Sequence, residues 1–171
     1  MTAAELRTER LRLRGFRADD ADALARLYLD PDIMAYLPGY PEGFDANLAR
    51  ARQDIVAYNA HWQQRGYGVW AVEDLSERRL IGRCGLRWLD QFNAVELLYM
   101  YDKTHWRRGF ASEAAGRAVA FGLGERRLTD LIGLVLSENA GSRRVLEKTG
   151  FSYDRHTQFR GYTVMLYRRG P

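Results

Sequence analysis

One short segment of the chain combines the features of an anion-binding loop. Residues 106–114 read WRRGFASEA, follow a predicted strand and open a predicted helix. The first amides of a helix have no intrahelical acceptor and lie at the positive end of its dipole. Gly109 permits close backbone approach, and Arg107 and Arg108 can add charge-assisted hydrogen bonds. The segment favours a pyrophosphate site, although a Gly-x-Ala helix start is equally typical of plain helix–sheet packing.

Hydrophobic periodicity predicts the elements that must position this segment. Strands are expected over 11–16, 67–73, 80–89, 95–101, 131–136, 153–159 and 162–167, and helices from about 20, over 45–64, over 109–124 and from 139 to about 150. Apolar residues on both faces of 95–101 indicate a central strand. Short turns or a broken helix are expected over 31–43, which holds three of the four prolines. The order predicts an α/β (α+β) fold with an antiparallel start and one βαβ crossover.

Length and composition exclude several classes of protein. The 171 residues suit one domain, spanning 1–171, with a formal net charge of +4. A single cysteine, Cys84, excludes an internal disulfide and a cysteine-based zinc site. The chain shows no apolar run long enough to span a membrane and no apolar signal core, so we expect a cytoplasmic protein. All cations except Lys103 and Lys148 are arginines, which favour anionic small ligands, and a diluted charge makes nucleic acid an unfavoured partner.

Three linked segments resemble the GNAT acetyltransferases, in the branch of the ribosomal-protein N-terminal acetyltransferases. They are ELLYMY at 96–101, WRRGFASEA at 106–114 and NAGSRRVLEKTGF at 139–151. Trp106, Gly109 and Ala111 fit the family's motif A, with the tryptophan that this branch commonly has first. Leu98 departs from the branch, which often has glycine there. The resemblance implies a GNAT fold: a mixed central sheet with a splayed parallel βαβ crossover, flanked by helices.

The resemblance also implies acetyl-CoA as the cosubstrate, with no metal. Its pyrophosphate would lie on the motif A loop, formed by Arg107, Arg108, Gly109, Phe110, Ala111 and Ser112. Backbone groups of Met100 and Tyr101 would pair with the pantetheine arm, and the amide near Tyr101 would polarise the thioester carbonyl. Asn139 would hold the arm from the other side. Arg144, with Arg143 and Lys148, would meet the adenosine 3′-phosphate or would simply be solvated.

The implied reaction is direct attack of a neutral amine on the thioester. Ser142 is the candidate proton donor or hydrogen-bond partner of the leaving thiolate, and its alternative role is that of an ordinary helix cap. Glu96 is the candidate general base, directly or through water. Its alternative role is that of a strand-entry carboxylate paired with a nearby arginine. Tyr101 completes the candidate catalytic set through its amide.

Other residues are expected to have structural roles. His61, His105 and His156 lack metal-ligand spacing and are expected in surface or loop positions. Arg10, Arg12 and Arg14 are expected to form solvated faces balanced by acids.

The acceptor stays open between a protein N-terminus and a small amine, with its pocket expected from residues 31–43 and 153–162. A non-catalytic acyl-CoA-binding or sensor module is the alternative function. Apolar strand edges would permit a homodimer.

Overall fold

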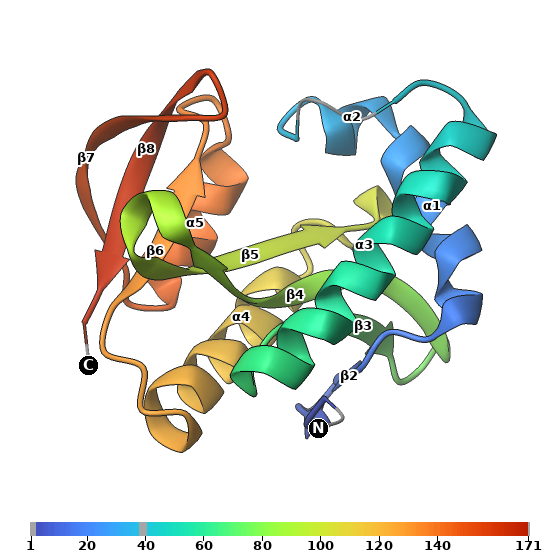
Figure 1. Cartoon of the computed structure of the whole chain (residues 1–171), viewed down its shortest axis with the longest axis horizontal. Helices are drawn as coiled ribbons and strands as arrows, with labels where there is room; N and C mark the ends of the chain where they lie inside the picture. The colour runs from blue at the N-terminus through green and yellow to red at the C-terminus, as the bar shows by residue number, and fades with distance from the viewer. Residues whose placement is uncertain (1–2, 38–40, 171) are drawn as a thin grey trace.

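The computed structural model describes residues 3–37 and 41–170. Its strands form one eight-stranded sheet in the order β1-β2-β3-β4-β5-β6-β8-β7 (Figure 1). They are β1 (Leu6–Arg7), β2 (Leu11–Arg14), β3 (Val69–Asp74), β4 (Arg79–Leu89), β5 (Ala94–Tyr101), β6 (Leu131–Val135), β7 (Ser152–Phe159) and β8 (Tyr162–Arg169). Neighbouring strands are antiparallel except β5 and β6, which confirms the predicted mixed sheet and its single parallel crossover.

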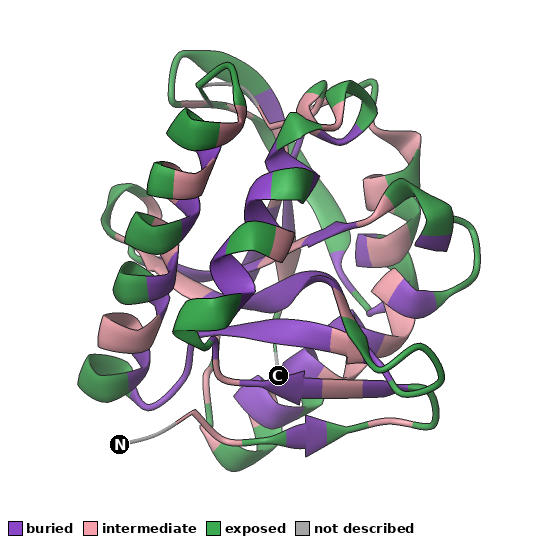
Figure 2. Ribbon diagram, turned by 90° about the vertical axis from the view of Figure 1, so that its right-hand side faces the viewer, coloured by how far each residue is buried: buried purple, intermediate pink, exposed green. Residues whose placement is uncertain are grey.

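Helices cover both faces of this sheet. They are α1 (Ala21–Leu29), α2 (Pro31–Met34), α3 (Phe44–Arg65), α4 (Phe110–Ala120) and α5 (Ala140–Lys148), with a π-helical turn over Phe121–Glu125. Helices α1 and α3 lie on one face and α4 lies behind the other (Figure 1). Figure 2 shows the central strands buried and the outer helix surfaces exposed. Among the described residues, no helix is both long and apolar enough to cross a membrane.

Two hydrophobic clusters lie on the two faces of the sheet, and each contains alternate residues of β5. Val95, Leu97 and Tyr101 pack into the cluster that contains α4 and α5 residues. Met100 and Leu98 pack into the cluster that contains α1 and α3 residues. A strand that is apolar on both faces must lie inside a sheet, and β5 is fifth of the eight strands, as its pattern predicts.

Arg10, Arg12 and Arg14 are balanced by acids as expected, but the structure corrects the expectation that Arg14 is solvated. Arg14 is buried and donates to Asp20 Oδ1 and Oδ2 at 2.7 Å each, and to Glu73 Oε1 at 2.6 Å. Asp20 precedes α1 but caps no amide of that helix with its side chain. Arg10 binds Glu113 on α4, and Arg12 pairs with two carboxylates. These ion pairs fasten β2 to neighbouring elements, and the buried charge of Arg14 in particular requires its partners.

Candidate active site

The two parallel strands separate almost as soon as they meet. Their register contains only the pairs Val95–Leu131 and Glu96–Ile132. The amide of Val95 points toward β6, where it bonds Asp130 O, whereas the amide of Asp102 points toward β4 and bonds Ile81 O. Main-chain groups alternate along a strand, so those of Tyr99 and Tyr101 face the gap between β5 and β6. The gap is therefore lined by main-chain donors and acceptors of β5.

The same alternation separates the two residues expected to pair with the pantetheine arm. The main chain of Tyr101 faces the gap, whereas that of Met100 pairs with Arg83 on β4. The side chain of Tyr101 lies in the core on the α4 side, where burial raises the pKa of its hydroxyl well above the usual value. Only the backbone of Tyr101 can therefore take part in chemistry at the gap.

The motif A loop presents the amides of α4 beside this gap. Gly109 is the N-cap residue with φ +83°, and Arg107 also has a left-handed φ of +59°. The amides of Phe110, Ala111 and Ser112 open the helix and have no acceptor within it. The Phe110 side chain is buried in the core and anchors the loop there.

A contact within the loop and hydrogen bonds from Thr8 and Arg10 hold it in place. The Arg108 guanidinium lies 4.8 Å from the centre of the Phe110 ring, and Arg10 donates to Arg108 O at 2.9 Å. Glu113, in the first turn of α4, accepts from Thr8 Oγ1 at 2.5 Å and from Arg10 Nε at 2.7 Å. Glu113 therefore ties α4 to the N-terminal strands and is not available to a ligand.

Trp106 has a role that the sequence does not reveal. Its indole Nε1 donates to Tyr101 O at 2.9 Å, across the turn between β5 and the motif A loop. The tryptophan therefore fixes the end of β5 relative to the start of α4. A buried polar group needs a partner, and this bond supplies one to the carbonyl that faces the gap.

Ser142 lies across the gap from β5 and contacts it through Tyr99. Its Oγ donates to Tyr99 Oη at 2.8 Å, and Tyr99 Oη donates to Ser142 O at 2.9 Å. Asn139 is the N-cap of α5 and accepts from the Ser142 amide at 2.9 Å. The cap is thus Asn139, and the Ser142 hydroxyl remains for other chemistry. Burial raises the pKa of Tyr99, so its phenol stays protonated.

Glu96 stands where the parallel strands part and is paired with an arginine, as its alternative role predicts. Arg87, opposite it on β4, donates from Nε at 3.0 Å and from Nη2 at 2.5 Å, both to Glu96 Oε2. The Glu96 side chain is buried and the Arg87 side chain is partly exposed. Both donors bond the same carboxylate oxygen, so the ion pair fixes the position of the Glu96 side chain on β5.

The remaining candidates lie on α5 and near the loop. Arg144 and Lys148 are exposed on α5, whereas Arg143 Nε is buried with no hydrogen-bond partner among the described residues. Their contact with a 3′-phosphate stays a prediction. The predicted acceptor hairpin is formed by β7 and β8 and exposes Tyr153 and Tyr162. Of the other predicted acceptor loop, 38–40 lie outside the described residues.

His105 follows β5 in a short turn, as expected for a loop residue, but it is buried. Its Nε2 lies 3.2 Å from Glu77 Oε1 and 3.9 Å from Asp74 Oδ2, within a group of possible metal-ligand atoms. Glu77 also accepts from Arg79 at 2.6 Å, and Asp74 accepts from the amide and hydroxyl of Ser76. The cluster fastens the β3–β4 turn to the loop that leads into α4, and we assign it no ion.

A strand gap lined by amides, beside a helix N-terminus, defines a site for an extended ligand with an anionic end. The comparisons agree with that class of site. The family model "Acetyltransferase (GNAT) domain" matches residues 10–152. The N-acetyltransferase YoaA of Bacillus subtilis (strain 168) is 30% identical over 147 residues, covering 85% of this chain and 81% of that protein. The protein YkkB of the same strain is 31% identical over 170 residues, covering 96% and 95%.

Solved structures show the same fold. An acetyltransferase from Agrobacterium tumefaciens superposes with a TM-score of 0.86 at 23% identity, covering all of this chain and 96% of that one. RimL, a ribosomal L7/L12 alpha-N-protein acetyltransferase solved with coenzyme A, has a TM-score of 0.78 at 16% identity and 98% coverage of both chains. The chain belongs to the GNAT acetyltransferase family. It is thereby an acetyl-CoA-dependent N-acyltransferase.

Proposed function

We propose that this chain acetylates a primary amine, either a protein N-terminus or a small molecule, by direct attack on acetyl-CoA. The observation that carries the proposal is the gap at Tyr99 and Tyr101, which opens between the α4 amides and Ser142. In this arrangement one ligand can reach an anion-binding helix start, a strand-like row of main-chain groups and a hydroxyl donor. We propose the cytoplasm as its compartment, because the reaction draws on acetyl-CoA.

The residues present fit acetyl-CoA, which would supply an acetyl group activated as a thioester. The loop from Arg107 to Ser112 would hold the pyrophosphate through its amides and its two arginines. Tyr101 would offer its amide to the pantetheine arm or to the carbonyl oxygen, because that amide faces the gap. Asn139 caps α5 with its oxygen and keeps its amide nitrogen for the arm.

The protons would move between two sides of the gap. The attacking nitrogen forms the new C–N bond as the C–S bond breaks, and it must lose one proton. Glu96 would take that proton, through water because Arg87 occupies one of its oxygens. To give a hydrogen bond or its proton to the leaving thiolate, Ser142 would turn its hydroxyl away from Tyr99 Oη, which accepts that proton in the resting protein. A thiol has a pKa of about 8.5, so the leaving thiolate needs little help from a proton donor.

The test has a binding part and a catalytic part. Calorimetry measures acetyl-CoA binding, and a thiol-release assay screens peptides of differing N-terminal residue together with small amines. The proposal expects saturable binding and amine-dependent release of thiol. Binding without release for every amine would instead support the non-catalytic acyl-CoA module, and failure to bind would refute both functions.

A matched pair of variants tests the loop. Arg107 and Arg127 are both exposed arginines with left-handed φ values, +59° and +54°, but only Arg107 lies at the start of α4. We expect Arg107→Gln to weaken acetyl-CoA binding by about tenfold, the effect of one charge-assisted hydrogen bond. Arg127→Gln should bind as the parent protein does. Equal affinities in the two variants would remove Arg107 from the site.

A further inference from the structure

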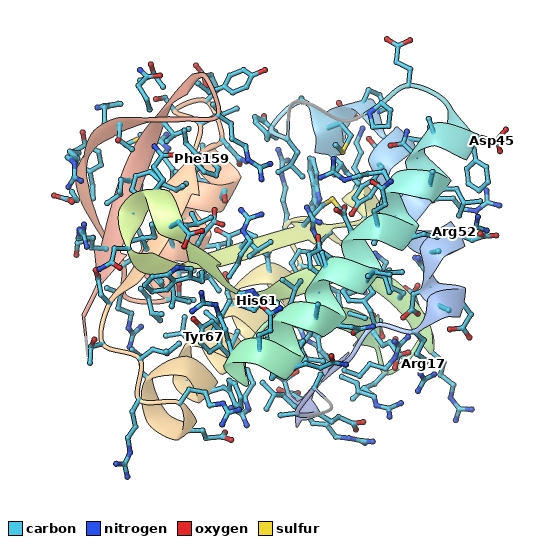
Figure 3. The ribbon with its side chains drawn as sticks, in the orientation of Figure 1. Arg17, Asp45, Arg52, His61, Tyr67 and Phe159 are labelled. Atoms are coloured by element: carbon cyan, nitrogen blue, oxygen red, sulfur yellow. The ribbon has the colours of Figure 1, made fainter. Side chains whose placement is uncertain are left out.

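A cationic pocket lies on the face of the sheet opposite α4 and α5. Its volume is about 250 Å³. It is lined by Arg50, Asp54, Ala57, Tyr58 and His61 of α3, Val69 of β3, Arg83 and Arg87 of β4, and Arg160 at the β7–β8 turn. Figure 3 shows His61 on the side of α3 that faces β5, and Phe159 at the end of the hairpin that approaches from the other side.

The pocket adjoins the point where the parallel strands part. Arg87 lines it and holds Glu96, and Glu96 forms the last parallel pair before β5 and β6 separate. Tyr99, by contrast, points its side chain to the opposite face, where it meets Ser142. An acceptor in this pocket would therefore approach the gap from the face opposite Ser142.

The charges that line the pocket are unbalanced. Four of its lining residues are arginines, and Asp54 is the one carboxylate among them. Asp54 already accepts from Arg50 at 2.9 Å and from Tyr28 Oη at 2.7 Å, and it lies 4.0 Å from Arg83. Adding Glu96, which pairs with Arg87, still leaves two carboxylates against four guanidinium groups.

The burial of these arginines shows which ones form the floor of the pocket. Arg83 is buried and donates to Tyr28 Oη at 3.1 Å and to Tyr58 Oη. These bonds give Arg83 a structural role. Arg160 is exposed, and its guanidinium stands 5.3 Å from the Phe159 ring. Arg50 and Arg87 are partly exposed. The outer arginines thus keep their charge accessible above a cationic floor.

His61, on one wall of the pocket, adds no compensating negative charge. Burial lowers the pKa of His61, and the charges of Arg65 and Arg87 lower it further, so this wall is neutral at neutral pH. His61 Nε2 has no hydrogen-bond partner among the described residues. The positive field that disfavours a proton on His61 also disfavours a polycationic acceptor and attracts an anion.

We infer that the acceptor of this enzyme is a primary amine that also carries a carboxylate or phosphate group, which the pocket binds through Arg50, Arg87 and Arg160. The inference rests on the proposed function. It deepens that function by assigning a substrate class, because the net positive lining selects the group attached to the amine. A small volume limits the bound part to the anionic end of the acceptor.

The first experiment offers acceptors in isosteric pairs and measures thiol release with saturating acetyl-CoA. The peptide pair is Ala-Glu-amide and Ala-Gln-amide, and the small-molecule pair is β-alanine and β-alaninamide. The inference expects kcat/KM to be on the order of tenfold higher for the carboxylate member of the pair that reacts, with the advantage falling as salt is raised. The pair that reacts distinguishes a peptide acceptor from a small one. Equal or faster reaction of the carboxamides would overturn the inference and leave the proposed function standing.

The second experiment measures binding and needs no turnover, so it tests the inference even when none of these amines reacts. Calorimetry with glutarate, and with its diamide as control, measures anion binding directly. We expect glutarate to bind more tightly than the diamide and to lose about tenfold in Arg160→Gln and in Arg50→Gln. Arg52→Gln is the matched control because Arg52 is exposed on the outer side of α3, two residues from Arg50 (Figure 3). Glutarate that binds no better than the diamide, or equal losses in all three variants, would overturn the inference.

Discussion

Replacement of Ser142 by alanine tests the assignment of the leaving-group side of the reaction. The Ser142 hydroxyl makes one hydrogen bond, to Tyr99 Oη at 2.8 Å, and Asn139 supplies the helix cap. Tyr99 retains its own donor bond to Ser142 O when the hydroxyl is removed. Ser142→Ala therefore costs one neutral hydrogen bond in the resting protein, about 0.5–1.5 kcal/mol of unfolding free energy.

The catalytic cost is larger if the hydroxyl faces a developing thiolate. A hydrogen bond to a charged group contributes about 1.5–3 kcal/mol. At about 1.36 kcal/mol per factor of ten in rate, kcat falls by roughly 10- to 150-fold. Acetyl-CoA affinity should change little, because this interaction grows only as the C–S bond breaks.

Single-turnover thiol release gives the chemical rate, calorimetry gives acetyl-CoA affinity, and urea denaturation gives stability. Tyr99→Phe is the control, since it removes the Ser142–Tyr99 hydroxyl bond together with the Tyr99 bond to Ser142 O, and leaves the serine hydroxyl in place. We expect Tyr99→Phe to lose more stability than Ser142→Ala but to keep more of the rate. A chemical rate within about threefold of the parent in Ser142→Ala would refute the reasoning, because it lies below the range calculated above.

Three further predictions address other parts of the chain. Trp106→Phe removes the indole bond to Tyr101 O, so the KM for acetyl-CoA should rise several-fold in steady-state assays, whereas an unchanged KM would mean that β5 is held without it. Burial lowers the pKa of His61, so as pH falls the unfolded chain takes up the imidazole proton before the folded chain does. The unfolding free energy should therefore decrease as pH falls through about 6.5. Denaturation at several pH values should show this slope in the parent and a flatter one in His61→Gln. Cys84 is buried and its pKa is raised to about 12 by burial, so a thiol reagent should detect no protein thiol until the chain is unfolded, and prompt labelling of the folded protein would contradict that burial.

Much of the fold follows from local patterns in the sequence. Strand 95–101 is apolar on both faces and is central in the sheet, and the final hairpin turns at Arg160 and Gly161, both with positive φ. The strand Leu6–Arg7 escaped prediction because two residues carry no periodicity. Near residue 31 the prolines left short turns and a broken helix open, and the structure has a one-turn helix that Asp30 caps by accepting from the amides of Asp32 and Ile33.

Predictions of individual side chains depended on whether their partners were near in sequence. The pairing of Glu96 with an arginine was open to prediction because Arg87 lies nine residues away on the adjacent strand. Alternating leucine and arginine is typical of a half-solvated strand, so this pattern did not predict that Arg14 is buried. Glu73, one of the carboxylates that pair with Arg14, comes from a distant segment. The Ser142–Tyr99 bond spans 43 residues, and no pattern within one element indicates it.

The gap between β5 and β6 places an incomplete strand edge in the interior of the molecule. Unpaired strand edges on a surface invite pairing with other chains and hence aggregation. Here the outer edges of the sheet are β1 and β7, whereas the main chain of Tyr99 and the amide of Tyr101 face the gap between paired strands. A narrow ligand with spaced amides can reach this edge, but a strand of another protein, with side chains on both faces, would collide with the helices that cover the sheet. Under the proposed function, the chain would keep a backbone-pairing surface for its cosubstrate without the self-association that an external edge would risk.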